Sequence, residues 1–399
     1  MPPKTFEFID VRDWCQPAES AAQLLDRPRT WWPLLEPCRA AAAKPDWHLS
    51  EGLGEEDFLA GVSTNIGLPL GREIAVSGSV IAHLGPAIVK DSSLLVLVRD
   101  NLALTEGYGD RRWAGFQLQS WPQAHNLHRS VVGVNGPGWQ MGVKAYDIDE
   151  RTLLRLDRPC LYLSARRDDR NLYHWLFETL PRLICLDAVP DLRRLPFLVR
   201  EPLTDLQLAF LKWMGFEQEV IVTKGRSVLA PDLFFASIPS PPPLHRPLLD
   251  WLRRRILAGL PEPAAPPTRR LFISRLDAGN GRRVVNEEEV VEALQPLGFE
   301  RLVMSRCPPL EQVQAFRQAE LVVLPHGAAG GHLLFMPEGS SVIELHSPTQ
   351  LNNVYFAASK TLGLSYGSMA GTRGGSGNDY SVDPQRLLGL LALAERRRP

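Results

Sequence analysis

The hydrophobic positions of this chain follow two different spacings, and the spacing changes along the sequence. Between residues 71 and about 165 the apolar runs are short and are separated by Gly and Asn, as in 73–76, 80–82 and 93–98. Such punctuation is typical of an antiparallel meander. We therefore expect a β-rich region ahead of the rest of the chain.

From about residue 195 onward, short apolar runs alternate with amphipathic helical segments. This alternation predicts parallel α/β sheets, in which each buried strand is followed by a covering helix. Strands are expected at 195–199, 220–222, 233–236, 270–273, 301–304, 319–324 and 341–345, and helices at 205–214, 251–257, 287–294, 310–319 and 355–361.

Prolines divide these segments. The sequence holds 34 prolines, and the run at 261–267 is typical of a stiff linker. We place the main domain boundary there. The expected organisation is an N-terminal arm (1–70), a domain with the β-rich lead (71–260), an α/β domain (268–365) and a C-terminal tail with a helix (366–399). In the arm, Trp31, Trp32 and Trp47 are interpreted as packing anchors.

A segment at 171–183 carries two stripes at helical spacing. Leu172, Trp175 and Leu176 begin an apolar stripe. Polar side chains recur three and four residues apart on a second face: Asn171, His174, Glu178 and Arg182. Asn171 is placed as an N-cap, and Pro181 should kink or end the helix. An amphipathic helix with a Glu178–Arg182 ion pair and a satisfied histidine is one interpretation, and a base presented to a substrate is the other.

The stretch at 319–345 has the pattern strand, small-residue loop, short apolar helix, turn, strand. The loop begins with His326, Gly327 and Ala328. It follows the carboxyl end of a buried strand, where α/β sheets bind ligands. Backbone N–H groups at the start of the helix would suit a phosphate.

Overall composition excludes several classes. The formal net charge is −1 over 399 residues, so nothing indicates bulk nucleic-acid binding or attraction to an anionic membrane. Five cysteines without a close pair favour a reducing compartment over a disulfide framework. The chain lacks a signal-peptide pattern and a run of about 18 apolar residues, so we expect a cytoplasmic protein without a transmembrane segment.

Three segments in order resemble glycosyltransferase family 61, in its bacterial capsular-polysaccharide-type branch. They span about residues 165–346. The first is 171–178 with Pro181 and Arg182; the second is 272–275, Arg282, Arg283, Asn286 and Glu287; the third is Glu311, Gln312, Ala319, 325–328, Phe335, 337–339, Ile343 and Glu344. The family pattern continues after the His-Gly-Ala motif with Gly-Leu-Thr-Asn, whereas here Ala329, Gly330, Gly331 and His332 follow.

The resemblance implies an α/β fold of the GT-B type, with two Rossmann-like domains facing a cleft. It implies an inverting transfer of a sugar from a nucleotide-sugar donor, usually UDP-linked, to an acceptor hydroxyl in surface polysaccharide or glycan synthesis. It also implies no essential metal and no cofactor. The pair Asp147 and Asp149, a kind of pair that is common by chance and that here lies outside the parallel-sheet segments, is interpreted as surface charge, in agreement with this implication.

An inverting transfer without a metal needs cations and helix N-termini at the departing diphosphate. Ser274, Arg275 and Arg283 follow the first strand of the α/β domain, and we assign both arginines to the pyrophosphate. Arg282 is as well explained by a solvated loop charge. Asn286 is expected to be an N-cap, with Glu289 completing a capping box beside the donor.

On the other side of the same loop, His326 is assigned to the diphosphate or the sugar. Gly327 and Ala328 permit close backbone approach. Glu344 is assigned to the ribose hydroxyls, or to a nearby arginine. Arg182 completes the donor-binding set.

The transfer also needs a base. A histidine titrates near neutral pH, so His174 is the candidate, with Glu178 orienting it or acting instead. The alternative is a non-catalytic nucleotide-sugar-binding subunit of a polysaccharide assembly complex. A Rossmann dehydrogenase is disfavoured because no Gly-x-Gly-x-x-Gly follows a strand. The sugar, the acceptor, the oligomeric state and any peripheral association with the inner membrane are open.

Overall fold

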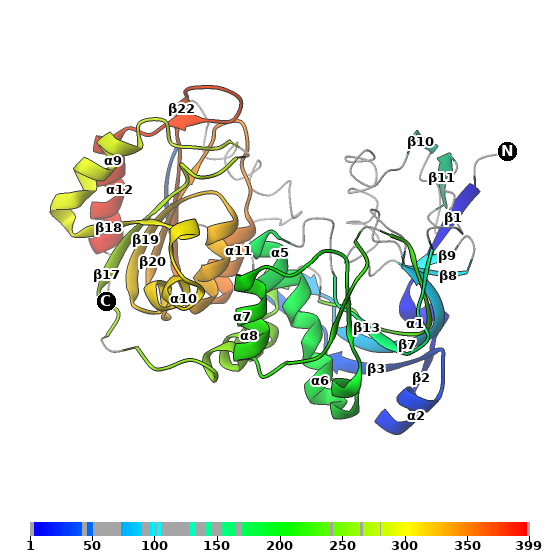
Figure 1. The fold of residues 1–399 in the computed structure, drawn as a ribbon. Helices are drawn as coiled ribbons and strands as arrows, with labels where there is room; N and C mark the ends of the chain where they lie inside the picture. The colour runs from blue at the N-terminus through cyan, green and yellow to red at the C-terminus, as the bar shows by residue number, and fades with distance from the viewer. Residues whose placement is uncertain are drawn as a thin grey trace. The chain divides into compact units, whose positions relative to one another are not determined.

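The chain folds into two compact units (Figure 1). The first contains residues 1–38 and 76–242, and the second contains 39–75 and 243–399. The computed structural model describes residues 4–41, 46–50, 73–89, 96–99, 102–104, 128–132, 140–144, 153–164, 170–224, 226–239, 242–263, 266–279 and 281–396. The Asp147 and Asp149 pair lies outside these ranges.

The first unit is built on one mixed sheet. Its main path runs β10-β11-β1-β9-β8-β7-β16-β13-β14-β15. The strands are β1 (Lys4–Ile9), β7 (Ser79–Val89), β8 (Val96–Arg99), β9 (Leu102–Leu104), β10 (His128–Val132), β11 (Gln140–Lys144), β13 (Cys160–Tyr162), β14 (Phe197–Val199), β15 (Val220–Val222) and β16 (Val228–Ala236), with β2 (Gln16–Pro17), β3 (Thr30–Leu35) and β12 (Leu154–Arg155) off the path.

The sheet combines the two patterns seen in the sequence. The β7–β8 and β8–β9 pairs are antiparallel, which confirms the meander, whereas β16, β13, β14 and β15 pair in parallel. Val80, Ala82, Leu233 and Phe235 lie in one buried cluster. Apolar side chains of β7 and β16 therefore join the antiparallel half to the parallel half.

The helices of the first unit are short. They are α1 (Val11–Trp14), α2 (Ala21–Asp26), α5 (Leu172–His174), the π-helix η3 (Trp175–Thr179), the 3-10 helix η4 (Leu180–Ile184), α6 (Cys185–Ala188), η5 (Pro190–Arg194) and α7 (Asp205–Trp213). Gly215 follows α7 at φ 73°, in the left-handed conformation that ends a helix.

The second unit contains a fully parallel sheet in the order β18-β17-β19-β20-β21-β5. Its strands are β5 (Trp47–Ser50), β17 (Arg269–Ser274), β18 (Phe299–Val303), β19 (Ala319–Pro325), β20 (Ser341–His346) and β21 (Ser365–Ala370). If β17 is numbered 1 and β5 is left aside, the order of the other strands is 2-1-3-4-5. The direction of winding therefore reverses between β17 and β19. Ligands of doubly wound sheets bind outside the strand ends at such a switch point.

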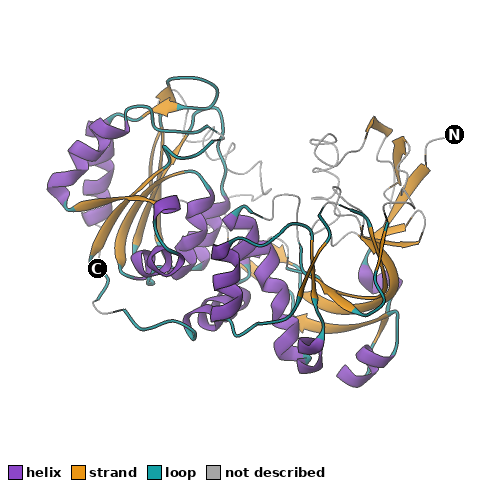
Figure 2. Cartoon of the chain, in the orientation of Figure 1, coloured by secondary structure: helices purple, strands orange, loops and turns teal. Residues whose placement is uncertain are grey.

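Helices lie on both sides of this sheet (Figure 2). Residues of α9 (Glu287–Leu294) and α12 (Pro384–Arg396) pack against Leu321, Val323 and Ile343 in one buried cluster. α11 (Val354–Thr361) contacts β21 and the 3-10 helix η9 (Ala328–Phe335). The other helices are α8 (Arg246–Leu257), α10 (Pro309–Arg317), η6 (Pro242–Leu244), η7 (Gln295–Leu297) and η8 (Met304–Arg306); β22 (Thr372–Arg373) pairs with β23 (Tyr380–Ser381), and β4 (Cys38–Ala41) with β6 (Glu73–Val76).

The division between the units differs from the one expected at 261–267. It falls between Pro242 and Pro243, because α8 belongs to the second unit. There, Arg246 donates to the carbonyl of Thr361 at 3.1 Å and pairs with Asp250 on its own helix. The proline-rich run thus connects two elements of one unit.

The two chain ends also differ from expectation. Residues 4–35 contribute strands to the first sheet, and β5 extends the second sheet beside β21, so these described parts of 1–70 do not form a separate arm. The expected tail, 366–399, holds most of β21 and all of α12.

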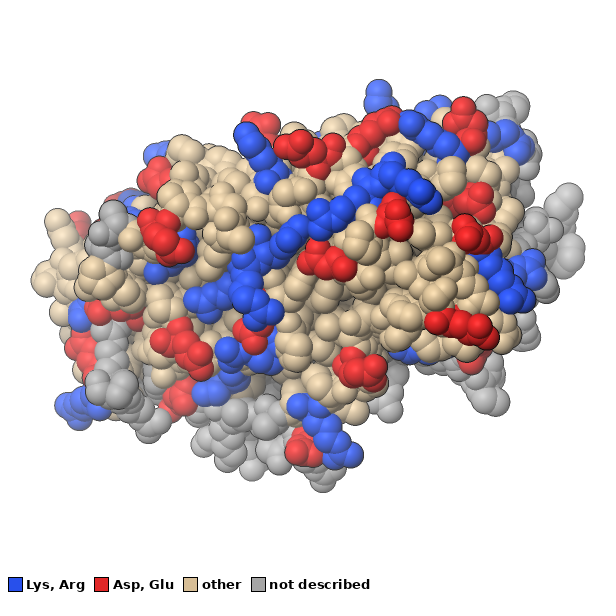
Figure 3. All heavy atoms as spheres, turned by 90° about the horizontal axis from the view of Figure 1, so that it is seen from below, with Lys and Arg blue, Asp and Glu red and all other residues tan. Residues whose placement is uncertain are grey.

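Charges of both signs occur on the surface. Figure 3 shows Lys and Arg interspersed with Asp and Glu on the face drawn. None of the helices in the described ranges combines the length and the apolar character needed to span a membrane.

The Asp46 carboxylate ties β5 to the second unit. It accepts a hydrogen bond from the backbone N–H of Tyr366 at 2.8 Å and pairs with Lys360 at 2.9 Å. Asp46 also donates its own N–H to the Tyr366 carbonyl at 2.9 Å. This residue therefore fixes where β5 begins to pair with β21.

We expect Asp46→Ala to lower the free energy of unfolding of the second unit by about 1–2 kcal/mol, because a partly buried N–H loses a charged acceptor. Hydrogen exchange of the β21 amides, with chemical denaturation, would measure this. Asp46→Asn is the matched control, since it keeps an acceptor for Tyr366 but loses the ion pair. Unchanged protection of β21 in Asp46→Ala would contradict the assignment.

Candidate active site

The helix that carries His174 changes from α to π to 3-10 geometry along its length. Asn171 caps it, accepting from the Tyr173 N–H at 2.9 Å, as predicted. Pro181 has no N–H to donate to the preceding turn. The helix passes through one π turn, with Leu180 N–H bonded to the Trp175 carbonyl, and then into 3-10 geometry. π turns inside helices are frequent at functional sites.

The π turn presents a histidine–carboxylate pair. His174 Nδ1 lies 3.0 Å from Glu178 Oε2. The His174 side chain is 20% exposed, whereas that of Glu178 is 6% exposed. Glu178 can therefore orient the ring through Nδ1, which leaves Nε2 for a proton-transfer partner.

Arg182 lies on the same helix but has contacts of a different kind. Its Nε donates to the Glu178 carbonyl at 3.1 Å, and its Nη1 donates to the Ala236 carbonyl at the end of β16. The guanidinium lies over the Phe235 ring, and the residue is 2% exposed. These contacts give Arg182 a structural role in the first unit, and its contact with a donor stays a prediction.

In the second unit, the switch point is occupied by the residues that follow β17. Ser274 ends the strand and is 4% exposed. Arg275 comes next, and its Nε donates to the Gly281 carbonyl at 3.2 Å. Burial and the nearby Arg282 lower the pKa of Arg275, so a positive charge is held at an electrostatic cost.

Arg282 is the second cation at this point. Its φ of 61° lies in the left-handed region, which is strained for a residue with a side chain. Burial lowers its pKa, partly offset by Tyr355, Tyr380 and Glu344. Within the described ranges it forms no ion pair with a carboxylate. Two neighbouring, partly buried guanidinium groups would suit a dianionic ligand.

Arg283 has a different environment from its neighbour. Its Nη2 and Nε donate to Asp379 Oδ2 at 2.8 and 3.1 Å, and its backbone N–H donates to Oδ1 at 2.9 Å. This pairing holds the Asp379 pKa below its usual range. The side chain assigned to the pyrophosphate from sequence is thus bound to Asp379, and Arg282 lies beside Arg275.

The loop after β19 is shaped by glycine. A Cβ on Gly327 would lie 2.0 Å from Arg275 Nη1, so the guanidinium rests against the backbone there. Ala328 then begins η9, the short helix expected from the sequence. A Cβ on Gly330 would lie 2.6 Å from the Tyr355 ring. The small residues therefore let an arginine and a tyrosine pack on the loop.

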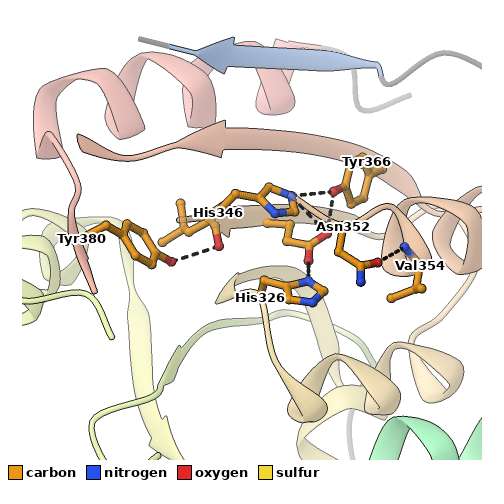
Figure 4. A network of polar contacts seen from close by, with 8 residues as sticks. His326, His346, Asn352, Val354, Tyr366 and Tyr380 are labelled. Atoms are coloured by element: carbon orange, nitrogen blue, oxygen red, sulfur yellow. Dashed lines mark hydrogen bonds and ion pairs between the residues drawn. The ribbon is translucent and has the colours of Figure 1, made fainter. Parts of the chain in front are cut away.

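Figure 4 shows the polar network at the ends of β19 and β20. His326 Nδ1 lies 2.5 Å from Glu344 Oε1, and the Tyr366 hydroxyl donates to Glu344 Oε2 at 2.5 Å. His346 Nε2 is 3.6 Å from Oε2. Glu344 is fully buried, so its expected contact with ribose stays a prediction while its oxygens bind His326 and Tyr366.

His326 is held neutral. Burial, Arg282 and Arg275 lower its pKa to about 3. Burial raises the pKa of Glu344, opposed by His346, the Tyr366 hydrogen bond and Arg282. The imidazole beside Arg275 and Arg282 therefore carries no positive charge near neutral pH.

Asn286 lies at the N-cap position of α9, as expected, but the predicted capping box is wrong. Its side chain makes no capping hydrogen bond to the first turn. Instead, its amide exchanges two hydrogen bonds with the Val382 backbone, at 2.8 and 3.0 Å, and donates to Glu289 at 3.1 Å. Asn286 thus joins α9 to the chain after β23, and its donor contact stays a prediction.

One group in the described part of the chain has spacing that would suit a metal ion. The ligand atoms of His326, Glu344 and His346 lie within 4.8 Å of one another. The chemistry of the group argues against a divalent cation, because Arg275 and Arg282 already lower the His326 pKa through their positive charge. Both carboxylate oxygens of Glu344 also have hydrogen-bond partners.

Sequence reasoning missed three residues of this region. Tyr366 lies in a small-residue run that gave no strand signal, Tyr355 was assigned only to a helix, and Arg282 was left open between function and a solvated charge. The resemblance did include the Arg282–Arg283 pair, but the backbone conformation of Arg282 and the Arg283–Asp379 ion pair distinguish the two side chains.

Comparisons with known proteins agree with this geometry. Residues 172–343 match the model of the family described as Glycosyltransferase 61, which is less than half of the chain. This segment contains His174, the switch point between β17 and β19, and His326.

A curated relative supports the same class. The EGF domain-specific O-linked N-acetylglucosamine transferase of Drosophila melanogaster is 31% identical over 96 residues, which is 23% of this chain and 18% of that protein. The match thus spans less than a fifth of the relative's length. Both similarities are to glycosyltransferases; neither distinguishes the bacterial capsular-polysaccharide branch, which stays a prediction.

The contacts of Arg182 generate a prediction about its role. Arg182→Met should lower the free energy of unfolding of the first unit by roughly 2–4 kcal/mol, since two buried carbonyls lose their donor. Thermal and denaturant melts would measure it, with Arg158→Met as the control because the Arg158–Glu219 pair is half exposed. A stable Arg182→Met protein that no longer binds UDP would restore the donor-binding role.

Proposed function

We propose that this protein is a glycosyltransferase that moves a sugar from a nucleotide-sugar donor to an acceptor hydroxyl. The observation that carries the proposal is the pair of partly buried cations, Arg275 and Arg282, at the switch point of a parallel sheet. The similarity of residues 172–343 to glycosyltransferase family 61 supports the class of reaction.

The donor diphosphate is proposed to bind at the carboxyl ends of β17 and β19. Arg275 and Arg282 would neutralise the charge that develops on the departing nucleotide, and backbone N–H groups at the start of η9 would add donors. Ser274, Gly327 and Ala328 line the same strand ends. A UDP-linked donor and a GT-B arrangement belong to this proposal. So does a metal-independent mechanism, because the chain itself supplies the cations for the diphosphate.

The acceptor side is proposed to use the His174–Glu178 pair of the first unit. An inverting transfer is a single displacement: the acceptor oxygen bonds to the anomeric carbon as the bond to the diphosphate oxygen breaks. The acceptor proton would pass to His174 Nε2, while Glu178 stabilises the resulting imidazolium through Nδ1. Nucleoside diphosphate is the leaving group.

Synthesis of a surface polysaccharide or glycan in the cytoplasm is the proposed setting. The second candidate function, a nucleotide-sugar-binding subunit without transfer activity, would keep the donor site but would not need the His174–Glu178 pair. The 3.0 Å contact of that pair in a π turn favours the enzyme.

The direct test is release of UDP from a panel of UDP-sugars, with and without an acceptor mixture. We expect release with at least one sugar, and no loss when EDTA is added. Binding of UDP without turnover of any donor would favour the binding subunit, and activity lost on chelation would contradict the metal-independent mechanism.

The neighbouring arginines provide a matched pair of variants. Arg282→Gln should weaken UDP binding roughly 10- to 100-fold, because a partly buried charge-assisted contact is removed. Arg283→Gln should change UDP affinity by less than about threefold, since Arg283 is bound to Asp379. Isothermal titration would compare them, and equal losses would return Arg283 to the pyrophosphate site.

His174 can be tested by separating binding from turnover. His174→Ala should lower kcat by roughly 10²- to 10⁴-fold, the usual effect of losing a general base, while UDP affinity is unchanged. Glu178→Gln should show a smaller loss, because the ring keeps its Nδ1 partner but not the charge. Turnover of His174→Ala at the normal rate would remove His174 as the base.

A further inference from the structure

The His326–Glu344 contact leaves one nitrogen of the imidazole for a ligand. Nδ1 faces Glu344, and no described residue hydrogen-bonds Nε2. The side chain is 8% exposed, and Nε2 is not among the buried polar atoms that lack a partner. The open nitrogen therefore reaches solvent at the end of β19, next to Gly327.

The proton on this imidazole decides what Nε2 can bind. A neutral histidine with its proton on Nδ1 offers Nε2 as an acceptor, whereas the other tautomer offers a donor. A diphosphate at neutral pH carries acceptor oxygens only, so it needs a donor. A hydroxyl can donate, so it suits an acceptor.

The charges around Glu344 favour the first tautomer. Arg282 has no carboxylate partner in the described ranges, and Glu344 is the acid whose charge stabilises it. Burial raises the pKa of Glu344, while the Tyr366 hydroxyl, which donates a hydrogen bond to Oε2 at 2.5 Å, and the nearby Arg282 act against that rise. We infer that these contacts keep Glu344 ionised; it then accepts at Oε1 as well, and the proton between it and His326 belongs to Nδ1.

We propose that Tyr366, Glu344 and His326 form a buried relay, here called the β20 relay, which fixes Nε2 of His326 as an acceptor for a hydroxyl of the bound nucleotide sugar. The inference rests on the proposed function and deepens it: the diphosphate binds Arg275 and Arg282, and His326 recognises a hydroxyl beside it. Tyr366 and Glu344 are positioning residues, since they act through the imidazole (Figure 4).

The relay also separates His326 from the chemistry of transfer. With its pKa lowered to about 3, the ring does not hold a proton taken from an acceptor near neutral pH. It can accept a hydrogen bond without becoming charged. Its contribution is recognition of the donor, in contrast to the base role proposed for His174.

The test begins with the free protein and needs no ligand. ¹⁵N NMR of the imidazole, assigned with a His326→Asn variant, should show Nδ1 protonated and Nε2 unprotonated in the full-length chain. Tyr366→Phe should shift the ring toward the other tautomer, because Glu344 loses a stabilising donor. Nε2 protonated in the unaltered protein would overturn the proposal.

Ligand binding then identifies the hydroxyl. By isothermal titration, 2′,3′-dideoxy-UDP should bind on the order of tenfold more weakly than UDP, the value of one hydrogen bond to a desolvated acceptor. In Tyr366→Phe and Glu344→Gln that ratio should fall toward one, while inorganic pyrophosphate binds as before. Another outcome is that the unaltered protein binds UDP and dideoxy-UDP equally well, while the relay variants weaken only the binding of the UDP-sugar that is turned over. That outcome would place the recognised hydroxyl on the transferred sugar.

Tyr380→Phe is the matched control. Its hydroxyl donates to the Leu345 carbonyl at 2.9 Å in the same core, so it removes a buried tyrosine hydroxyl outside the relay. It should leave both the tautomer and the UDP to dideoxy-UDP ratio unchanged. Equal weakening of UDP, dideoxy-UDP and pyrophosphate by the relay variants would overturn the hydroxyl assignment. No UDP binding to the unaltered protein would overturn the proposed function, while the NMR result would still report the relay.

Discussion

The second unit depends on how it balances charge inside a sheet. Arg275 and Arg282 place positive charge near the ends of parallel strands, and the Glu344 carboxyl on the neighbouring strand β20 raises the pKa of Arg282. Neither sign is tolerated alone in a site of low dielectric constant. Tyr366 and His326 hold the carboxylate in place, so strand register, loop conformation and ligand chemistry are coupled through one buried acid.

The backbone conformation of a few residues makes this balance possible. Gly327 lets the Arg275 guanidinium lie against the loop, and Arg282 has a left-handed backbone conformation. In the first unit, the π turn before Pro181 plays a comparable part, since it sets His174 against Glu178. Both candidate centres thus occur where regular structure is locally interrupted.

Much of the α/β organisation could be predicted from sequence because parallel strands buried on both faces are continuous apolar runs. β17, β19 and β20 are of this kind, and the residues after them were found as strand ends. β21 and β5 were missed because Ser365–Ala370 is small and polar and Trp47–Ser50 is very short. Their pairing is set by neighbours far away in the sequence, which local patterns do not report.

The candidate site divides in the same way. Residue type and spacing indicated Arg275, His326 and Glu344, but not which nitrogen of His326 faces a ligand. The choice between Arg282 and Arg283 depended on one φ angle and on Asp379, almost a hundred residues later. Arg182 matched a polar stripe, yet its partners are backbone carbonyls of the helix itself and of β16. Tertiary partners decide such roles, and they leave no periodic signal.

The position of β5 has a consequence for how the protein is made. This strand ends at Ser50, but its partner β21 begins at Ser365, about 315 residues later. At translation rates of about 5–20 residues per second, β5 waits roughly 15–60 s for a partner. During that time its backbone groups remain an open edge, to which another strand can add. The sheet of the second unit can be completed only near the end of synthesis. Until then, β5 in the nascent chain has to be kept from pairing with other strands.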